Sequence, residues 1–206
     1  MKLIFIGPQG SGKGTQAKIL SEKLNIPHIS TGDLLRDAQE ELKEKLHEYM
    51  NSGQLVPDEL IAKILKKRLE EQDTKEGFIL DGFPRNINQT ELLKPITEID
   101  KVIEITLSDE EAVKRISGRI TCKECKAGYN TLTAPKPQQP NICDKCQGKL
   151  IRRNDDTEEA VKKRLEIYHQ ETEPILEEYK EQSLKINGEQ AIEKIAENID
   201  QALKIN

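Results

Sequence analysis

Aromatic residues are scarce in this chain of 206 residues, which has no tryptophan, three phenylalanines and four tyrosines. Proteins that hold single-stranded nucleic acid stack the bases on aromatic side chains, so this composition argues against that class. The net charge of −5, from 32 basic and 37 acidic residues, also argues against a general polyanion binder. We therefore expect no nucleic-acid partner, and any phosphate binding must use a local cluster of groups.

Long hydrophobic runs are missing as well. No apolar stretch reaches the roughly 18 residues that a membrane-spanning helix needs. The first ten residues, MKLIFIGPQG, are too short an apolar stretch for a signal peptide and contain no small-residue cleavage site. We expect a cytoplasmic protein with no membrane partner. The length corresponds to one domain with small insertions.

Arginine is rare relative to lysine, because only eight of the 32 basic residues are Arg. Lysine is thus the ordinary surface cation of this protein. The guanidinium group is a planar donor that binds carboxylates and phosphates through two hydrogen bonds at once. The few arginines therefore indicate positions where that geometry is required.

Strand and helix patterns alternate along the chain, which indicates parallel βαβ units. Short apolar runs predict strands at 2–6, 27–30, 78–81, 101–107 and 183–187. Helical patterns cover roughly 13–24, 31–51, 58–72, a segment after Ser108, 157–181 and the C-terminus. We predict a three-layer α/β sandwich around a five-stranded parallel sheet.

Two helix starts carry the pattern of a capping box, in which a short polar residue precedes a glutamate by three positions. Ser108 with Glu111 predicts one helix start, and Asp156 with Glu159 predicts the next. Pro174 should kink the second of these helices, since proline has no backbone N–H to donate.

Two segments interrupt the alternation. Residues 121–150 hold all four cysteines and three of the nine prolines without a helical period. Residues 31–60 are helical where a single crossover would suffice. We predict a core of 1–29, 61–120 and 154–206, with inserted units at 30–60 and 121–153.

The first strand leads directly into Gly7-Pro8-Gln9-Gly10-Ser11-Gly12-Lys13-Gly14-Thr15, which fits the phosphate-binding pattern G-x-x-x-x-G-K. Glycines let backbone N–H groups point at phosphate oxygens, Lys13 reaches the β- and γ-phosphates, and the helix N-terminus adds its dipole. The loop indicates a nucleotide, not a particular reaction.

The cysteines form two knuckles, Cys122-x₂-Cys125 and Cys143-x₂-Cys146, separated by 17 residues. Four thiolates at this spacing predict a closed tetrahedral Zn²⁺ site with a structural role. Two disulfides, a redox pair or an iron–sulfur cluster are the alternatives.

Further motifs follow the phosphate loop in order. They are Ser30-Thr31-Gly32-Asp33 with Arg36, Asp81-Gly82-Phe83-Pro84-Arg85 with Gln89, and the segment 157–170. Together with Gly7–Thr15 they resemble the adenylate kinase family of nucleoside monophosphate kinases, in its long form with a zinc lid. The resemblance covers essentially the whole chain.

This resemblance implies a role for each matched residue. ATP would be held by Gly10, Ser11, Gly12, Lys13, Gly14, Thr15, Arg115, Arg119, Gly128, Tyr129 and Gln190. AMP would be held by Thr31, Arg36, Gln54, Leu55, Val56, Gly82, Phe83, Pro84, Arg85, Gln89, Arg153 and Arg164. Lys13, Asp81, Arg85, Arg119, Arg153 and Arg164 would serve catalysis, with Asp81 orienting water around Mg²⁺. Cys122, Cys125, Cys143 and Cys146 would bind zinc.

The reaction that the resemblance implies is ATP + AMP = 2 ADP by direct in-line transfer. Charge on the transferred phosphoryl group calls for positioned cations rather than a general base. Six of the eight arginines fall at the positions that the resemblance assigns. Arg115 and Arg119, four residues apart, should share one helix face. His28, His47 and His169 should be structural or surface residues.

Three positions depart from the family pattern, namely Gln9, Asn130 and Asn154. They leave open the fine shape of the donor pocket. Two rival functions also stay open, a monophosphate kinase with another acceptor or a GTP donor, and a zinc-ribbon nucleic-acid-binding ATPase. Two covers, 31–60 and 121–153, should close to exclude water. We expect a monomer.

Overall fold

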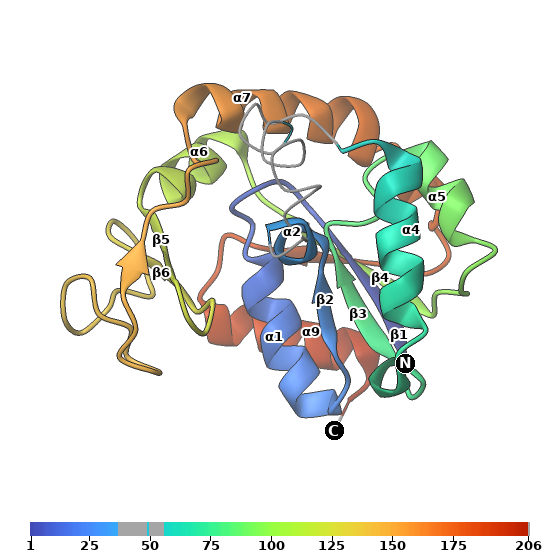
Figure 1. Ribbon diagram of the computed structural model, residues 1–206, viewed down its shortest axis with the longest axis horizontal. Helices are drawn as coiled ribbons and strands as arrows, with labels where there is room; N and C mark the ends of the chain where they lie inside the picture. The colour runs from blue at the N-terminus through green and yellow to red at the C-terminus, as the bar shows by residue number, and fades with distance from the viewer. Residues whose placement is uncertain (37–48, 50–55, 206) are drawn as a thin grey trace.

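The computed structural model describes residues 1–36, 49 and 56–205. A five-stranded parallel sheet lies at its centre, in the order β2-β3-β1-β4-β8 (Figure 1). The strands are β1 (Lys2–Ile6), β2 (His28–Ser30), β3 (Phe78–Asp81), β4 (Lys101–Thr106) and β8 (Ser183–Asn187). The predicted five-stranded parallel sheet is confirmed.

Helices cover both faces of this sheet. They are α1 (Lys13–Leu24), α2 (Thr31–Arg36), α4 (Asp58–Leu69), α5 (Ile87–Leu93), α6 (Asp109–Ser117), α7 (Glu158–Ile167), α8 (Ile175–Glu178) and α9 (Ile192–Leu203), with short turns η1 (Gln72–Thr74) and η2 (Tyr168–Thr172). Successive side chains of a strand point to opposite faces. Leu3 and Phe5 of β1 accordingly pack with α1 and α9, whereas Ile4 and Ile6 pack with α4 and α8.

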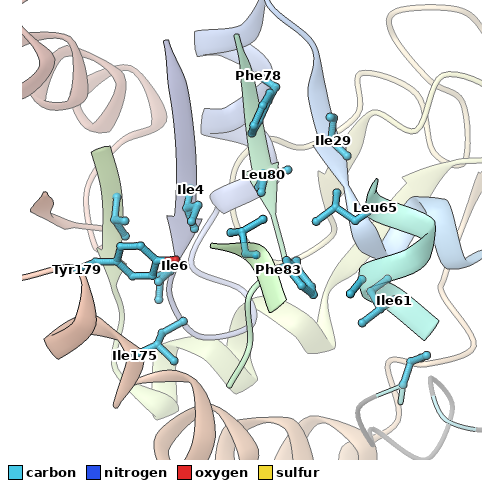
Figure 2. Close-up of a cluster of buried hydrophobic side chains, with 14 of the residues drawn as sticks. Ile4, Ile6, Ile29, Ile61, Leu65, Phe78, Leu80, Phe83, Ile175 and Tyr179 are labelled. Carbon is cyan, nitrogen blue, oxygen red and sulfur yellow. The ribbon is translucent and has the colours of Figure 1, made fainter. Parts of the chain in front are cut away.

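The second of these cores extends to Phe83, which follows β3. Figure 2 shows Phe83 in the same buried cluster as Ile4 and Ile6. Phe83 is 1% exposed. This fully buried ring anchors the turn after β3, because removing a large aromatic side chain from a core costs about 3–5 kcal/mol.

A small antiparallel sheet stands apart from the central one, in the order β6-β5-β7. We call it the lid sheet, formed by β5 (Arg119–Cys122), β6 (Gly128–Asn130) and β7 (Leu150–Ile151). Its own small core contains Cys122, Tyr129, Cys143 and Leu150. No helix in the described ranges is long and apolar enough to cross a membrane.

Both predicted capping boxes need correction. Ser108 is the N-cap of α6 but makes no side-chain capping bond. Its hydroxyl instead donates to Oε1 of Glu189 at 2.6 Å. Thr157, not Asp156, caps α7, and its hydroxyl accepts from the Ala160 N–H at 3.2 Å. Asp156 is drawn away by an ion pair with Arg119.

The single helix predicted over 157–181 is also wrong. It is divided into α7, the π-helical turn η2 and α8. At the end of η2 the Glu173 N–H donates to the Tyr168 carbonyl at 2.8 Å, a wide i to i+5 bond. This wide turn comes directly before Pro174, whose ring would clash with a helical carbonyl four residues back.

Two other helical predictions meet the structure only in part. The helix predicted over 31–51 includes α2, and its remainder lies mostly outside the described residues. The helix predicted over 58–72 ends earlier, since α4 stops at Leu69.

Candidate active site

A cleft of about 1110 Å³ runs along the carboxyl edge of the parallel sheet. Residues from the loop after β1, from α2, from the end of β3, from the lid sheet and from α7 line it. Pockets for one small ligand usually measure about 300–1,000 Å³. The cleft is larger than the usual pocket for one small ligand, and it lies at the edge where open α/β sheets bind their ligands.

The loop between β1 and α1 presents an open helix N-terminus to the cleft. Gly12 is the N-cap of α1 with φ of 91°, and no side chain caps the helix. A Cβ atom on Gly12 would meet no atom within 4 Å. The predicted residues Gly10, Ser11, Gly12, Lys13, Gly14 and Thr15 all line the cleft. Unpaired N–H groups and the helix dipole favour an anion at this position.

The Lys13 ammonium lies within this loop. Its Nζ donates to the carbonyl oxygens of Gly7 at 2.6 Å and Pro8 at 2.9 Å. Burial lowers the pKa of Lys13 to about 8, with the negative charge of Asp81 opposing the shift and the positive charge of Arg85 adding to it. A phosphate bound at the loop would favour the protonated amine.

Asp81, at the end of β3, faces the phosphate loop. Its Oδ2 lies 3.3 Å from Nε2 of His28, and a Cβ atom on Gly14 would lie 3.2 Å from Oδ2. Burial alone would raise the pKa of Asp81, but the contact with His28 and the charge of Lys13 outweigh it and lower the pKa. The carboxylate thus stays ionised. His28, expected to be a structural or surface residue, therefore contacts a carboxylate of the cleft, which no pattern in the sequence indicated.

Two of the predicted motifs contact each other where the turn after β3 meets the start of α2. The Thr31 hydroxyl donates to the Asp81 carbonyl at 3.2 Å, and Nε of Arg85 donates to the Gly82 carbonyl at 2.8 Å. Gly82 has φ of 88°, and a Cβ atom there would lie 2.7 Å from Oγ1 of Thr31. Only glycine fits between these side chains, because other residues rarely adopt this φ.

Arginines from several elements face the same cleft. They are Arg36 of α2, Arg85 after β3, Arg115 of α6, Arg119 of β5, Arg153 shortly after β7, and Arg164 of α7. Burial lowers the pKa of Arg85 to about 10, and the charge of Arg164 adds to the shift. Burial likewise lowers the pKa of Arg153 to about 10, assisted by the charge of Arg119. Such mutual repulsion among buried cations is relieved by a polyanion.

Carboxylates hold some of these arginines in place. Asp155 lies 2.8 Å from Arg164 and 3.7 Å from Arg36, and Asp33 lies 2.8 Å from Arg36. Asp156, whose side chain is fully buried, pairs with Arg119. Each carboxylate fixes a guanidinium by charge-assisted hydrogen bonds. No carboxylate lies within 4 Å of Arg85 or Arg153 among the described residues.

The prediction that Arg115 and Arg119 share one helix face is wrong. Helix α6 ends at Ser117, Gly118 follows as its C-cap, and Arg119 begins β5. Both arginines still line the cleft. Nε of Arg115 donates to Oε1 of Glu111 at 3.0 Å. Glycine is a common helix stop, so Gly118 was the available signal.

The residues predicted to bind AMP divide into three groups. Thr31, Arg36, Val56, Gly82, Pro84, Arg85, Gln89, Arg153 and Arg164 line the cleft. Phe83 belongs to the buried core and supports the turn from below. Gln54 and Leu55 lie outside the described residues. Within the first group, Gln89 is engaged on both sides, accepting from the Arg85 N–H at 2.7 Å and donating to Asp58 at 2.7 Å.

The donor-side residues Gly128, Tyr129 and Gln190 line the cleft as well. A Cβ atom on Gly128 would meet nothing within 4 Å, so its backbone faces open space. The Tyr129 hydroxyl turns toward the cysteines, 3.5 Å from Sγ of Cys143, and accepts from the Asp144 N–H at 2.9 Å. Gln190 accepts from Asn198 at 2.8 Å.

The four cysteines gather in the lid sheet, and all four Sγ atoms lie within 4.8 Å of one another. The distance is 3.5 Å both for Cys122 to Cys146 and for Cys125 to Cys143. None forms a disulfide. Tetrahedral Zn–S bonds of about 2.3 Å place sulfurs about 3.8 Å apart. The cluster therefore fits a four-thiolate zinc site, and the arrangement argues against the disulfide alternative.

Comparisons with known proteins agree with this geometry. A family model described as adenylate kinase matches residues 5–184. An adenylate kinase of Caldicellulosiruptor bescii is 47% identical over 212 aligned residues, covering 99% of this chain and 98% of the relative. An adenylate kinase of Archaeoglobus fulgidus is 47% identical over 214 residues, with 99% and 98% covered. An adenylate kinase of Streptomyces coelicolor is 46% identical over 192 residues, covering 89% of this chain and 88% of the relative.

These matches extend over nearly the whole chain and over every element that builds the cleft. The chain is therefore similar to these relatives along nearly its whole length and not only in one motif. The chain belongs to the adenylate kinase family, and its activity is the reversible reaction ATP + AMP = 2 ADP.

Proposed function

We propose that ATP and AMP occupy the cleft together and that the γ-phosphoryl group passes directly between them. ATP lies with its phosphates on the loop Gly10–Thr15 and its adenosine toward Arg115, Gly128, Tyr129 and Gln190. AMP lies on the opposite side. The acceptor side comprises Thr31, Arg36, the segment 54–56, the turn Gly82–Arg85 and Gln89.

The observation that carries this proposal is the convergence of six arginines and Lys13 on one cleft. Bringing the phosphates of two nucleotides together requires that their mutual repulsion be neutralised. A loose phosphoryl-transfer transition state carries its charge on the equatorial oxygens, where positioned cations stabilise it. Arg85, Arg119, Arg153 and Arg164 are proposed to surround this group.

The transfer needs no protein base. The AMP phosphate has a second pKa near 6 and is largely a dianion at neutral pH. One of its oxygens forms the new bond to the γ-phosphorus as the bond from that phosphorus to the β,γ-bridging oxygen breaks. ADP leaves on both sides, and no proton changes place.

Two metals belong to this proposal. Mg²⁺ bound with ATP would supply positive charge to its phosphates, and Asp81 would hold the water shell of the ion. Zn²⁺ in the cysteine cluster would be structural, since four thiolates leave no open position. Its role would be to stiffen the lid sheet that connects Arg119 and Arg153.

Closure completes the proposed mechanism. Residues 121–153 would cover the donor and residues 30–60 the acceptor around the core of 1–29, 61–120 and 154–206. Covering the site removes water, which otherwise competes for the γ-phosphoryl group. We propose a cytoplasmic protein, because the four cysteines form no disulfide, as is usual in a reducing compartment. We propose that it acts as a monomer, since the groups assigned to both nucleotides line one cleft of a single chain.

Product analysis tests the proposal directly. The purified protein is incubated with Mg·ATP alone and with AMP, GMP, CMP or UMP, and the products are separated by chromatography. ADP forming from both nucleotides only when AMP is present is the expected result. Hydrolysis of ATP without acceptor preference contradicts the two-nucleotide mechanism and favours an ATPase.

Direct transfer has its own test, which uses ATP carrying a chiral, isotopically labelled γ-thiophosphate. A single displacement inverts the configuration at phosphorus, whereas a phosphorylated enzyme intermediate gives net retention. Inversion is expected. Retention, or label remaining on the protein after denaturation, contradicts the mechanism.

A further inference from the structure

Gln9 stands inside the phosphate loop with a side chain that is only half satisfied. Its Oε1 accepts a hydrogen bond from Nη1 of Arg164 at 3.4 Å. Its Nε2 is buried and has no partner among the described residues. The side chain thus joins the loop to α7 through one end of the amide, while the other end is left without an acceptor.

An unpaired buried amide donor destabilises a folded protein, because the group has lost its hydrogen bonds to water. Such a donor is explained when a ligand supplies the missing acceptor. The amide cannot be turned over to solve the problem internally, since this would point its N–H groups at the Arg164 guanidinium.

The surroundings of Gln9 determine what kind of acceptor fits. Gln9, Lys13, Arg85 and Arg164 all line the same cleft. Burial lowers the pKa of Arg85, and the positive charge of Arg164 is close enough to add to that shift. A site with this charge selects an anion, and phosphate oxygens are strong acceptors for amide N–H groups.

We propose that Nε2 of Gln9 donates a hydrogen bond to an oxygen of the phosphoryl group during its transfer, while Oε1 holds Arg164 against the same group. Gln9 is then a catalytic residue contributed by the phosphate loop itself. The proposal rests on the proposed placement of the ATP phosphates on residues 10–15. A neutral donor suits this position, because it adds a hydrogen bond without adding to the repulsion among the arginines.

Arg164 does not depend on Gln9 for its position. Nη2 of Arg164 donates to Oδ2 of Asp155 at 2.8 Å, a shorter bond between charged groups. Replacing Gln9 therefore removes the amide while Arg164 keeps its stronger anchor. This separation makes the role of the amide measurable.

Two variants test the proposal. Gln9→Met keeps the length of the side chain and removes both ends of the amide. Gln9→Glu keeps an acceptor for Arg164 and removes the donor. We expect both variants to lower kcat at least tenfold in the forward and reverse directions, with KM for AMP changed less than threefold. Gln72→Met, at an exposed glutamine outside the cleft, is the matched control and should behave as wild type.

The pattern across the variants decides the outcome. If kcat falls in Gln9→Met but stays at the wild-type value in Gln9→Glu, the residue acts only by holding Arg164 and the proposal is overturned. It is overturned too if Gln9→Met keeps its activity, or if the main effect is on KM for AMP.

A spectroscopic readout separates this proposal from the placement of ATP. The side-chain amide signal of Gln9 is assigned by its loss in Gln9→Met, and Mg²⁺ with the β,γ-imido analogue of ATP and with AMP is then added to the wild-type protein. Shifts of the backbone amides of residues 12–15 together with the Gln9 side chain support the proposal. Shifts of the backbone alone overturn the role of Gln9 and leave the ATP site intact. If neither the backbone amides nor the Gln9 side chain shifts, the proposed ATP site itself is contradicted.

Discussion

The carboxylate of Asp155 lies 2.8 Å from the guanidinium of Arg164, and both side chains face the nucleotide cleft. The same carboxylate lies 3.7 Å from Arg36, so it neutralises one cation from α2 and one from α7. Burial alone would raise the pKa of Asp155, but the charges of Arg164 and Arg36 outweigh it and lower the pKa. Asp155 therefore remains an anion that holds the cationic site together before nucleotides arrive.

Asp155→Asn should destabilise the nucleotide-free protein, because it leaves two partly buried cations without their counter-charge. Breaking a buried ion pair by removing one partner costs about 3–5 kcal/mol, and the residual solvent contact here reduces that to about 2–3 kcal/mol. Urea unfolding measures the change. Saturating ATP and AMP should stabilise the variant more than the wild type, since their phosphates replace the missing charge.

Asp73→Asn is the matched control for this prediction. Asp73 also pairs with an arginine, at 2.6 Å from Arg68, but its side chain is 51% exposed. Exposed pairs contribute little to stability because water screens them. Equal losses of unfolding free energy in the two variants would contradict a larger contribution of the buried Asp155 pair.

Arg153→Lys should lower kcat by about tenfold or more, although the positive charge is retained. Lysine offers a single ammonium where arginine offers a planar fork matched to phosphate oxygens, and loss of one such donor from a transition-state site costs about 10²–10³ in rate. Steady-state kinetics in both directions provide the measurement. The neighbouring Arg152 is exposed and does not line the cleft, so Arg152→Lys should keep full activity. Equal behaviour of the two variants would contradict a role for Arg153 in transfer.

The strands were predictable because apolar runs report burial directly. Residues 2–6 were expected as a strand and form β1 with the same bounds, and β4 ends one residue before the predicted limit. The phosphate loop could be predicted equally well, since its glycines and Lys13 follow a buried strand in sequence. Both features depend on local patterns.

Features that depend on tertiary partners were not predictable. Asp156 and Thr157 are both capable N-cap residues, and the choice between them is made by Arg119, which is distant in sequence. The π-helical turn before Pro174 also has a distant partner, because the Thr172 hydroxyl donates to the Arg85 carbonyl at 2.7 Å. No periodicity in the sequence reports such a contact.

Lys13 should give the enzyme a pH limit on the alkaline side. Its pKa in the free protein is lowered to about 8, so the amine is protonated below pH 8 and loses its charge above it. The value of kcat/KM for ATP, which reports the free enzyme, should fall as pH rises through about 8. Bound phosphates raise the pKa of Lys13, so kcat should stay constant to a higher pH.

The ionisation of AMP does not interfere with this measurement, since its second pKa lies near 6. Lys13→Arg supplies the control, because a guanidinium keeps its proton throughout the range. Its kcat/KM, although lower, should show no decline between pH 7.5 and 9.5. A wild-type kcat/KM that stays level to pH 9.5 would show that Lys13 keeps its proton in the free enzyme.

Removing the metal from the cysteine cluster should unfold the lid sheet before the core. The lid sheet has a small apolar core, two of whose members are Cys122 and Cys143, so metal bonds would supply much of its folding energy. A strong chelator should lower Tm and abolish transfer, with zinc restoring both. Metal analysis should find one zinc per chain, and thiol titration of the chelated, denatured protein should find four free thiols. Fewer than four thiols would indicate disulfides, and iron in place of zinc would indicate a cluster of a different kind.

Cys143→Ser should behave like the chelated protein, since Cys143 is fully buried and a serine hydroxyl is a poor zinc ligand there. Val113→Ala, at an exposed apolar position on α6, should leave Tm nearly unchanged and shows that the loss is specific to the cluster.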